Sequence, residues 1–275
     1  MSKFLSLFAK PFPIIGMIHV GALPGTPLYR GCFEKVVENA CKEAEVYQEN
    51  GVDGILIENM HDIPYIRPSD NLGPEVTAAM ARVACAVRQT VSSIPCGVQI
   101  LAGCNREALA VAKACKLQYI RAEGFVFGHM ADEGFTDACA GSLLRYRKQI
   151  DAEDVLVLTD IKKKHSSHAI TNDVSIGETA HAAEFFLSDG LVITGASTGA
   201  SASEVELSSL VGKTDLPLII GSGLTLENFT NYRQLSHGAI VGSHFKTNGH
   251  WAEKLCPKRI KAFMNHVNTL REQAT

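Results

Sequence analysis

Eight short runs of apolar or β-branched residues recur along the chain, and each is followed by a longer segment with helical periodicity. Strands that alternate with helices form parallel sheets, because a parallel neighbour is reached only through a crossover connection. The runs predict parallel strands at residues 14–20, 54–59, 97–101, 118–122, 155–160, 190–194, 216–220 and 238–241.

The number of these units and the chain length of 275 residues constrain the fold class. Eight strand–helix units in roughly 250 residues are typical of a (β/α)8 TIM barrel. We therefore predict an α/β protein in which residues 1–275 form one such barrel as a single domain. The alternative is an open doubly wound sheet, which uses the same units. No linker, low-complexity stretch or short-period repeat indicates a second domain.

Local signals refine the positions of helices and loops. Ser175 and Ser201 each precede a glutamate by three residues, which is the spacing of a capping box and predicts a helix start at each serine. The connections after the second and fourth strands, residues 60–73 and 123–140, exceed the common two to six residues. Two long loops at the same face of a barrel predict a lid.

Charge and cysteine usage exclude several classes of protein. The net charge is −3, from 26 basic and 29 acidic residues, so the chain lacks the positive field that nucleic acid requires. Its eight cysteines never occur as C-x-x-C, which predicts a reducing compartment and no structural zinc. No apolar run approaches the roughly 18 residues of a membrane span.

A targeting segment at residues 1–13 would indicate the cellular compartment. Residues 1–13 are too short and too weakly basic for a secretory signal, so we expect a soluble cytoplasmic protein. A short mitochondrial presequence is the alternative, since Phe4, Leu5, Leu7 and Phe8 are accompanied by lysines.

Polar side chains collect where the predicted strands end, which is where barrel proteins build their sites. In strand order they are His19, Glu58, Gln99, Arg121 with Glu123, Asp160 with Lys162, Thr194, Ser222 and Ser243. We expect Glu58, Gln99, Arg121, Asp160 and Thr194 to line one cavity. The substrate-binding residues are predicted to be His19, Gln99, Arg121, Glu123 and Thr194, although Arg121 and Glu123 can also simply neutralise each other.

Asp160 and Lys162 share one parity on the fifth strand and should then face the same cavity. We assign Glu58 and Asp160 as acid and base, with Lys162 stabilising charge. A second version makes Lys162 a Schiff-base nucleophile whose pKa is depressed by desolvation or by Lys163. If Asp160 is catalytic, Asp160→Asn should abolish turnover and barely change the melting temperature.

The seventh and eighth strands run into small-residue turns, Gly221-Ser222-Gly223 and Gly242-Ser243. Glycine lets bare main-chain amides approach an anion, and this part of a barrel often holds phosphate. These turns predict a phosphate site to which Lys246 contributes. The alternatives are that the glycines only make tight turns and that Lys246 is solvated.

No pattern in the chain predicts a cofactor. The sequence has no P-loop, no Rossmann glycine pattern and no nucleophile elbow. His165-x-x-His168 has a spacing that a metal can use on a helix, but no further ligand is fixed by spacing. We expect neither cofactor nor metal, no nucleic-acid partner and a phosphorylated small molecule as ligand, and the sequence leaves a homo-oligomer open.

Several segments together resemble the BtpA family along almost the whole chain. They are Gly16-Met17-Ile18-His19-Val20, Leu23-Pro24-Gly25-x-Pro27, Glu58-Asn59-x-x-Asp62-x-Pro64, Asp160-Ile161-x-x-Lys164-His165, Thr194-Gly195-x-x-Thr198-Gly199, Gly221-Ser222-Gly223-x-Thr225-x-Glu227-Asn228 and Val241-Gly242-Ser243-x-x-Lys246. The resemblance implies a barrel fold. The family is named for photosystem-I biogenesis in cyanobacteria, and a nucleosidase-like activity has been suggested for some members. It supplies no catalytic residues.

Two functions of different classes follow. The first is an enzyme that acts by carboxylate and lysine acid–base chemistry on a phosphorylated sugar or nucleotide-like metabolite, as a lyase, isomerase or nucleosidase-like enzyme. The second is a non-catalytic assembly or stability factor, since a fold alone does not imply catalysis.

Overall fold

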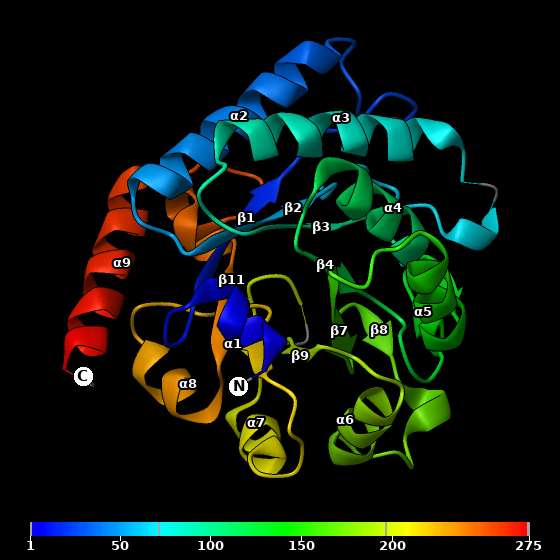
Figure 1. The fold of residues 1–275 in the computed structure, drawn as a ribbon, viewed down its shortest axis with the longest axis vertical. Helices are drawn as coiled ribbons and strands as arrows, with labels where there is room; N and C mark the ends of the chain where they lie inside the picture. The colour runs from blue at the N-terminus through cyan, green and yellow to red at the C-terminus, as the bar shows by residue number, and fades with distance from the viewer. Residues whose placement is uncertain (1, 71, 196, 274–275) are drawn as a thin grey trace.

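The computed structural model describes residues 2–70, 72–195 and 197–273. Parallel strands close into a barrel in the order β1-β11-β10-β9-β7-β4-β3-β2, with helices around the outside (Figure 1). The barrel strands are β1 (Ile14–His19), β2 (Gly54–Glu58), β3 (Cys96–Gln99), β4 (Tyr119–Ala122), β7 (Leu156–Ile161), β9 (Gly190–Ile193), β10 (Leu218–Ile220) and β11 (Gly238–Val241). The predicted TIM barrel is confirmed, and the open sheet is excluded because β1 pairs with both β2 and β11.

Strand alternation divides the apolar side chains into two cores. Side chains of one parity, such as Met17, Leu56 and Tyr119, fill the barrel interior. Those of the other parity, such as Ile18 and Ile57, pack against the helices. Both faces of each strand are therefore apolar until the strand ends, so a polar residue at an end stands out in the sequence.

The helices mostly follow the predicted pattern. The major ones are α2 (Phe33–Glu49), α3 (Pro74–Thr90), α4 (Asn105–Cys115), α5 (Ala140–Gln149), α6 (Ile176–Phe185), α7 (Glu204–Leu210), α8 (Phe229–Leu235) and α9 (Pro257–Glu272). The capping box of Ser175 and Glu178 is confirmed at the start of α6. The one predicted at Ser201 is wrong: Ser203 caps α7, while the Ser201 hydroxyl donates to the Gly223 carbonyl.

Helix α1 (Lys3–Phe8) is the segment in which the sequence suggested a presequence, and in the structure it belongs to the barrel. Phe4 is fully buried and Phe8 nearly so, and both join the interior core. The Phe8 ring lies 5.9 Å from the ring of Tyr119. Figure 1 shows α1 inside the ring of helices. Phe4 and Phe8 lie against the strand starts at Gly238 and Gly54, so they close the amino-terminal end of the barrel.

The two long connections lie at the opposite end of the barrel. The first contains the 3₁₀ turn η1 (Pro68–Asp70), and the second folds into a hairpin of β5 (His129–Ala131) and β6 (Gly134–Thr136). Strand β5 also pairs with β8 (Ser166–Ser167), which follows β7. Tyr65 and Glu133 from the two connections line the same cavity, so both loops cover the carboxyl ends of the strands. No helix in the described ranges is long and apolar enough to cross a membrane.

Candidate functional site

Two adjoining cavities lie at the carboxyl ends of the strands. The smaller, of about 170 Å³, lies at the ends of β10 and β11. The larger, of about 600 Å³, extends beneath the two long connections. The same side chains contribute to the walls of both, namely Glu58, Met60, Arg121, Lys164 and Thr198. The two cavities therefore adjoin along these side chains.

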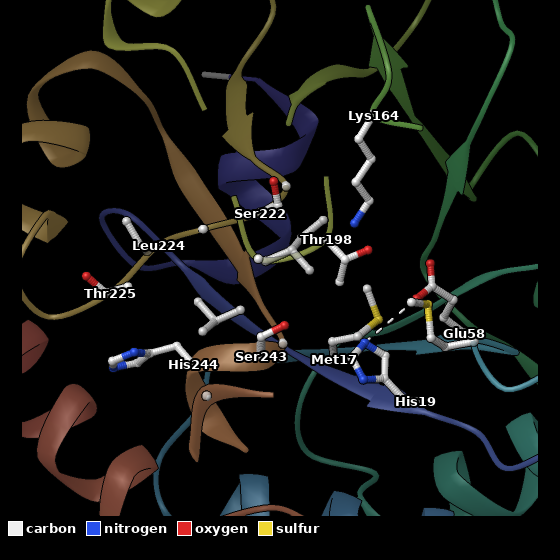
Figure 2. Close-up of a pocket in the computed structure, with 18 of the residues that line it drawn as sticks. Met17, His19, Glu58, Lys164, Thr198, Ser222, Leu224, Thr225, Ser243 and His244 are labelled. Atoms are coloured by element: carbon white, nitrogen blue, oxygen red, sulfur yellow. Dashed lines mark ion pairs between the residues drawn. The ribbon is translucent and has the colours of Figure 1, made fainter. Parts of the chain in front are cut away.

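The smaller cavity is lined by the predicted glycine–serine turns. Gly221, Ser222 and Gly223 follow β10, and Gly242 and Ser243 follow β11 (Figure 2). The main-chain N–H groups of Gly223 and Ser243 donate to no acceptor in the described part of the chain. Arg259 of α9 adds a guanidinium to the wall. Free amides with a nearby cation suit an anion.

The glycines of these turns have different reasons to be glycine. A Cβ on Gly221 would lie 2.5 Å from Val192 Cγ1, so this position is fixed by packing inside the barrel. Gly223 has a φ of +72°, and its Cβ would lie 2.4 Å from the main chain of Ser201. A Cβ on Gly242 would instead lie 3.3 Å from His19 Nε2 in the cavity wall. Only Gly242 therefore tests ligand approach separately from folding.

Two residues predicted to hold phosphate are engaged elsewhere. The Ser222 hydroxyl donates to the Ala200 carbonyl at 2.9 Å and accepts from the Gly195 amide, so its proton is not available to an anion. Lys246 is 2% exposed and forms a 2.7 Å ion pair with Glu43 of α2. It is neither solvated nor in the cavity wall, because the turn after β11 directs its side chain toward α2.

Most charged side chains at the carboxyl ends of the barrel strands, here called the barrel mouth, form ion pairs with one another. Arg121 binds Asp160 through two hydrogen bonds, Nε to Oδ2 at 2.9 Å and Nη2 to Oδ1 at 2.8 Å, and both side chains are buried. Lys163 pairs with Glu123 at 3.3 Å. The predicted alternative, that Arg121 and Glu123 neutralise each other, is therefore replaced by two separate pairs.

Lys162 lines the same small cavity as Asp160, as their shared parity predicts, but it lines neither of the two cavities that Glu58 lines. Strand β7 ends at Ile161, and the positive φ of Lys162 (49°) breaks the alternation. Its amino group donates to the Thr171 carbonyl at 3.1 Å. With Asp160 and His129 it lines a separate cavity of about 20 Å³.

Lys164, two residues further on, occupies the position expected of Lys162. Its amide donates to the Thr194 hydroxyl at 3.1 Å, which ties the turn to β9. Its amino group has no hydrogen-bond or ion-pair partner among the described side chains, and Figure 2 shows it extending into the cavity toward Thr198 and Glu58. Burial first, and the nearby Arg121 second, lower the pKa of Lys164.

Glu58 faces this amine across the cavity beside His19. Burial is the main cause that raises the pKa of Glu58. His19 Nδ1 lies 3.1 Å from the Trp251 carbonyl, which can only accept, so Nδ1 carries the proton and Nε2 is left as an acceptor. Burial and the Lys246 charge lower the pKa of His19 to about 3, and its neutral Nε2 lies 3.8 Å from Glu58 Oε2.

The larger cavity combines an apolar wall with one unsatisfied acceptor. Tyr65, Leu101 and Trp251 supply the apolar surface. Gln99 is 2% exposed, and its Oε1 has no donor among the described residues. A buried amide oxygen without a donor costs free energy, so a ligand hydroxyl or amino group at this place would be stabilising.

Of the five residues expected to share a cavity, Glu58, Gln99 and Arg121 line the larger one, as Glu123 does. Asp160 and Thr194 lie behind the wall and hold Arg121 and Lys164. Sequence reasoning missed Lys164, Arg259 and Trp251 as wall residues. Lys164 stands in a segment that carries the family resemblance, whereas no strand-end signal marks the other two.

The histidine pair considered for a metal is not arranged for one. His165 Nε2 lies 3.1 Å from the Thr198 hydroxyl, whereas His168 Nε2 lies 3.0 Å from the Lys163 carbonyl oxygen. The residues between them are in strand β8, so the helical spacing does not apply. Within the ranges that the structure describes, no three His, Cys, Asp or Glu side chains are grouped to hold a metal ion.

Comparisons with known proteins agree with this fold. An uncharacterised mitochondrial protein of Caenorhabditis elegans is 47% identical, with 98% of each chain covered. The photosystem I biogenesis protein BtpA of Synechocystis is 32% identical over 92% of this chain and 86% of its own. The solved (S)-3-O-geranylgeranylglyceryl phosphate synthase of Thermoplasma acidophilum shares the fold, with a TM-score of 0.61, 14% identity and coverage of 98% and 99%. Since the BtpA family model also matches residues 10–269, this chain belongs to the BtpA family.

Proposed function

We propose that the protein is an enzyme that binds a phosphorylated small molecule and acts on it by acid–base chemistry. The observation that carries the proposal is that the two cavities share a wall. An anion seat opens directly onto Glu58 and Lys164, which are not engaged in the ion pairs of Arg121 with Asp160 and of Lys163 with Glu123.

The smaller cavity is the proposed phosphate seat. The donors proposed for the anion are the amides of Gly223 and Ser243, the Ser243 hydroxyl and Nη1 of Arg259. The Arg259 Nε donates to the His244 carbonyl at 2.6 Å and Nη2 lies 3.3 Å from His244 Nδ1, so these two nitrogens hold the guanidinium in place. Charge-assisted hydrogen bonds contribute roughly 1.5–3 kcal/mol each. The synthase with the shared fold was solved with sn-glycerol-1-phosphate, so a barrel of this shape accommodates a phosphorylated ligand.

Glu58 and Lys164 are the proposed acid and base. A carboxyl with a raised pKa and an amine with a lowered pKa both approach the range in which proton transfer near neutral pH is efficient. Arg121 stabilises negative charge on the reacting group, and Asp160 positions Arg121. Gln99 accepts from a hydroxyl or amino group. These roles fit a lyase, isomerase or nucleosidase-like reaction on a phosphorylated sugar or nucleotide-like metabolite.

Calorimetry with inorganic phosphate tests the seat. Gly242→Val should weaken phosphate binding at least tenfold, about 1.4 kcal/mol, because the added side chain enters the cavity beside His19. Gly141→Ala, on helix α5, is the matched control and should leave the affinity unchanged. Equal affinity in wild type and Gly242→Val, with melting curves that show both folded, would refute the phosphate seat.

An assembly factor is the second candidate, and one feature of the outer surface favours it. Phe185, Leu187 and Val205 at helices α6 and α7 are 76%, 70% and 81% exposed. Phe185 also contacts the half-exposed Phe186, with ring centroids 5.7 Å apart, and exposed apolar side chains of this size are typical of interaction surfaces. If the protein acts through this surface, Phe185→Ser should abolish its cellular role while phosphate binding persists, and Glu58→Gln should leave that role intact.

Two cellular compartments, the cytoplasm and the mitochondrion, are compatible with the chain. All eight cysteines are free, which suits both the cytoplasm and the mitochondrion considered from the sequence. The mitochondrial name of the Caenorhabditis elegans relative favours the second. Microscopy of the full chain carrying a carboxyl-terminal fluorescent tag would distinguish the two.

A further inference from the structure

The amine of Lys164 has no hydrogen-bond or ion-pair partner among the residues that the structure describes, and it belongs to the wall of both cavities. Three acids and three bases gather at the barrel mouth: Glu58, Glu123, Asp160, Arg121, Lys163 and Lys164. Two ion pairs join four of them, Arg121 with Asp160 and Lys163 with Glu123. The remaining two, Glu58 and Lys164, line both cavities.

The surroundings of Lys164 disfavour the charged ammonium form relative to that of an exposed lysine. Its side chain is largely removed from solvent, and Arg121 supplies a fixed positive charge nearby, so the pKa of Lys164 is lowered. A neutral amine has a lone pair and is a nucleophile toward carbonyl carbon. A lysine that only stabilised charge would need to stay protonated, and Arg121 already provides a permanent cation in the same wall.

Glu58 is placed to act on the same carbonyl. It lies across the cavity from Lys164 (Figure 2). The neutral His19 ring presents Nε2, an acceptor, 3.8 Å from Glu58 Oε2, and burial keeps Glu58 protonated to a higher pH than an exposed glutamate. Imine formation requires an amine and a nearby acid, and Glu58, whose pKa is raised, is the nearby carboxyl.

We infer that Lys164 forms a Schiff base with the carbonyl carbon of a phosphorylated aldehyde or ketone whose phosphate occupies the smaller cavity. The inference rests on the proposed phosphate seat and names the substrate class and the covalent step. It replaces Lys162, the nucleophile considered from the sequence, with the lysine that faces the ligand.

The step balances without a further reactant. The Lys164 Nζ lone pair forms a bond to the carbonyl carbon, the carbonyl π electrons move to oxygen, and a proton passes from nitrogen to that oxygen, which gives a carbinolamine. The Glu58 carboxyl then donates its proton to the hydroxyl, which leaves as water while the nitrogen lone pair forms the C=N bond. The products are a protonated imine, one water molecule and the Glu58 carboxylate, which is then a base for the next proton transfer.

Borohydride trapping tests the inference on the full chain. The probes are dihydroxyacetone phosphate, glyceraldehyde 3-phosphate and pyridoxal 5′-phosphate, each added with sodium borohydride, which delivers hydride to the imine carbon and leaves a stable secondary amine. Intact-mass measurement and peptide mapping should find an adduct on Lys164 with at least one probe. Excess inorganic phosphate should suppress it at least tenfold, because both ligands need the same seat.

Variants separate Lys164 from its neighbours. Lys164→Met and Lys164→Arg should both lose the adduct, the second although it keeps the charge, whereas Lys162→Met should retain it because Lys162 lies in a different cavity. Circular dichroism melting curves confirm that each variant is folded.

The failures of the two proposals differ. If phosphate binds and none of the probes modifies Lys164, the Schiff base is refuted and the phosphate seat stands. Labelling that persists in Lys164→Met, or that excess phosphate leaves unchanged, also overturns the inference, because the adducts then belong to surface lysines. If phosphate itself fails to bind, the proposed function fails first.

Discussion

At the residue scale, the barrel mouth shows why similar side chains at strand ends acquire different roles. Arg121 and Asp160 are locked to each other by two hydrogen bonds, while Glu58 and Lys164 keep their polar atoms toward a cavity. Glu58 is the last residue of β2 and Asp160 the last but one of β7, so position along a strand hardly distinguishes them. What distinguishes them is the neighbouring strand: β4 supplies Arg121 as an ion-pair partner for Asp160.

The Asp160 pair yields a prediction that differs from the one made on the sequence alone. Asp160→Asn leaves the Arg121 guanidinium buried without its counter-charge, which typically costs about 3–5 kcal/mol. We therefore expect thermal unfolding to shift by several degrees, together with any loss of turnover. Asp154→Asn removes an exposed ion pair with Lys113 and should barely change the melting temperature. An unchanged melting temperature for Asp160→Asn would show that the pair is not structural.

At the scale of elements, the short helix α1 contributes two side chains to the core inside the barrel. It is only six residues long, yet Phe4 and Phe8 belong to the core inside the barrel. Gly54 and Gly238 at the strand starts are glycine partly for this reason, since a Cβ on either would approach these rings at 2.5 Å and 3.2 Å. The helix and the strand starts thus fit each other across more than 200 residues of sequence.

Truncation of the Phe4 side chain measures how much helix α1 contributes to the free energy of unfolding. Phe4→Ala removes a fully buried ring from the barrel end, and changes of this kind cost about 3–5 kcal/mol. Chemical denaturation should show the loss, with Ser6→Ala on the exposed side of the same helix as the control, expected within about 0.5 kcal/mol of wild type. Similar stabilities for the two variants would mean that α1 is not part of the cooperative fold.

At the scale of the whole molecule, stability should depend on pH through buried histidines. Burial is the first cause that lowers the pKa of His19 to about 3 and that of His129 to about 4. Below about pH 6.5 these histidines bind protons in the unfolded chain but stay neutral in the folded protein. The free energy of unfolding that they contribute is therefore fully present above pH 6.5 and is lost as the pH falls toward 4. Glu58 and Glu43 oppose the trend, since burial raises the pKa of each.

The difference between wild type and His129→Gln isolates one histidine, because the opposing acids are common to both proteins. Between pH 6.5 and 5, the stability of wild type should fall more steeply, by at most about 1.4 kcal/mol per pH unit. Denaturant melts at a series of pH values measure both slopes. Parallel slopes would show that His129 titrates normally in the folded protein.

The barrel fold, the BtpA family and the end of the barrel where the candidate cavities lie could all be predicted from the sequence. Those features depend on local periodicity and on residues that follow strands, and both can be read from one stretch of chain. Three features became evident only in the folded chain: which charges pair, that a positive φ turns Lys162 away from the two larger cavities, and that Lys164 lines them instead. Arg259 and Trp251 join the walls from segments after the last strand. Ion pairing and cavity walls depend on distances between side chains of separate elements, which no single stretch of sequence contains.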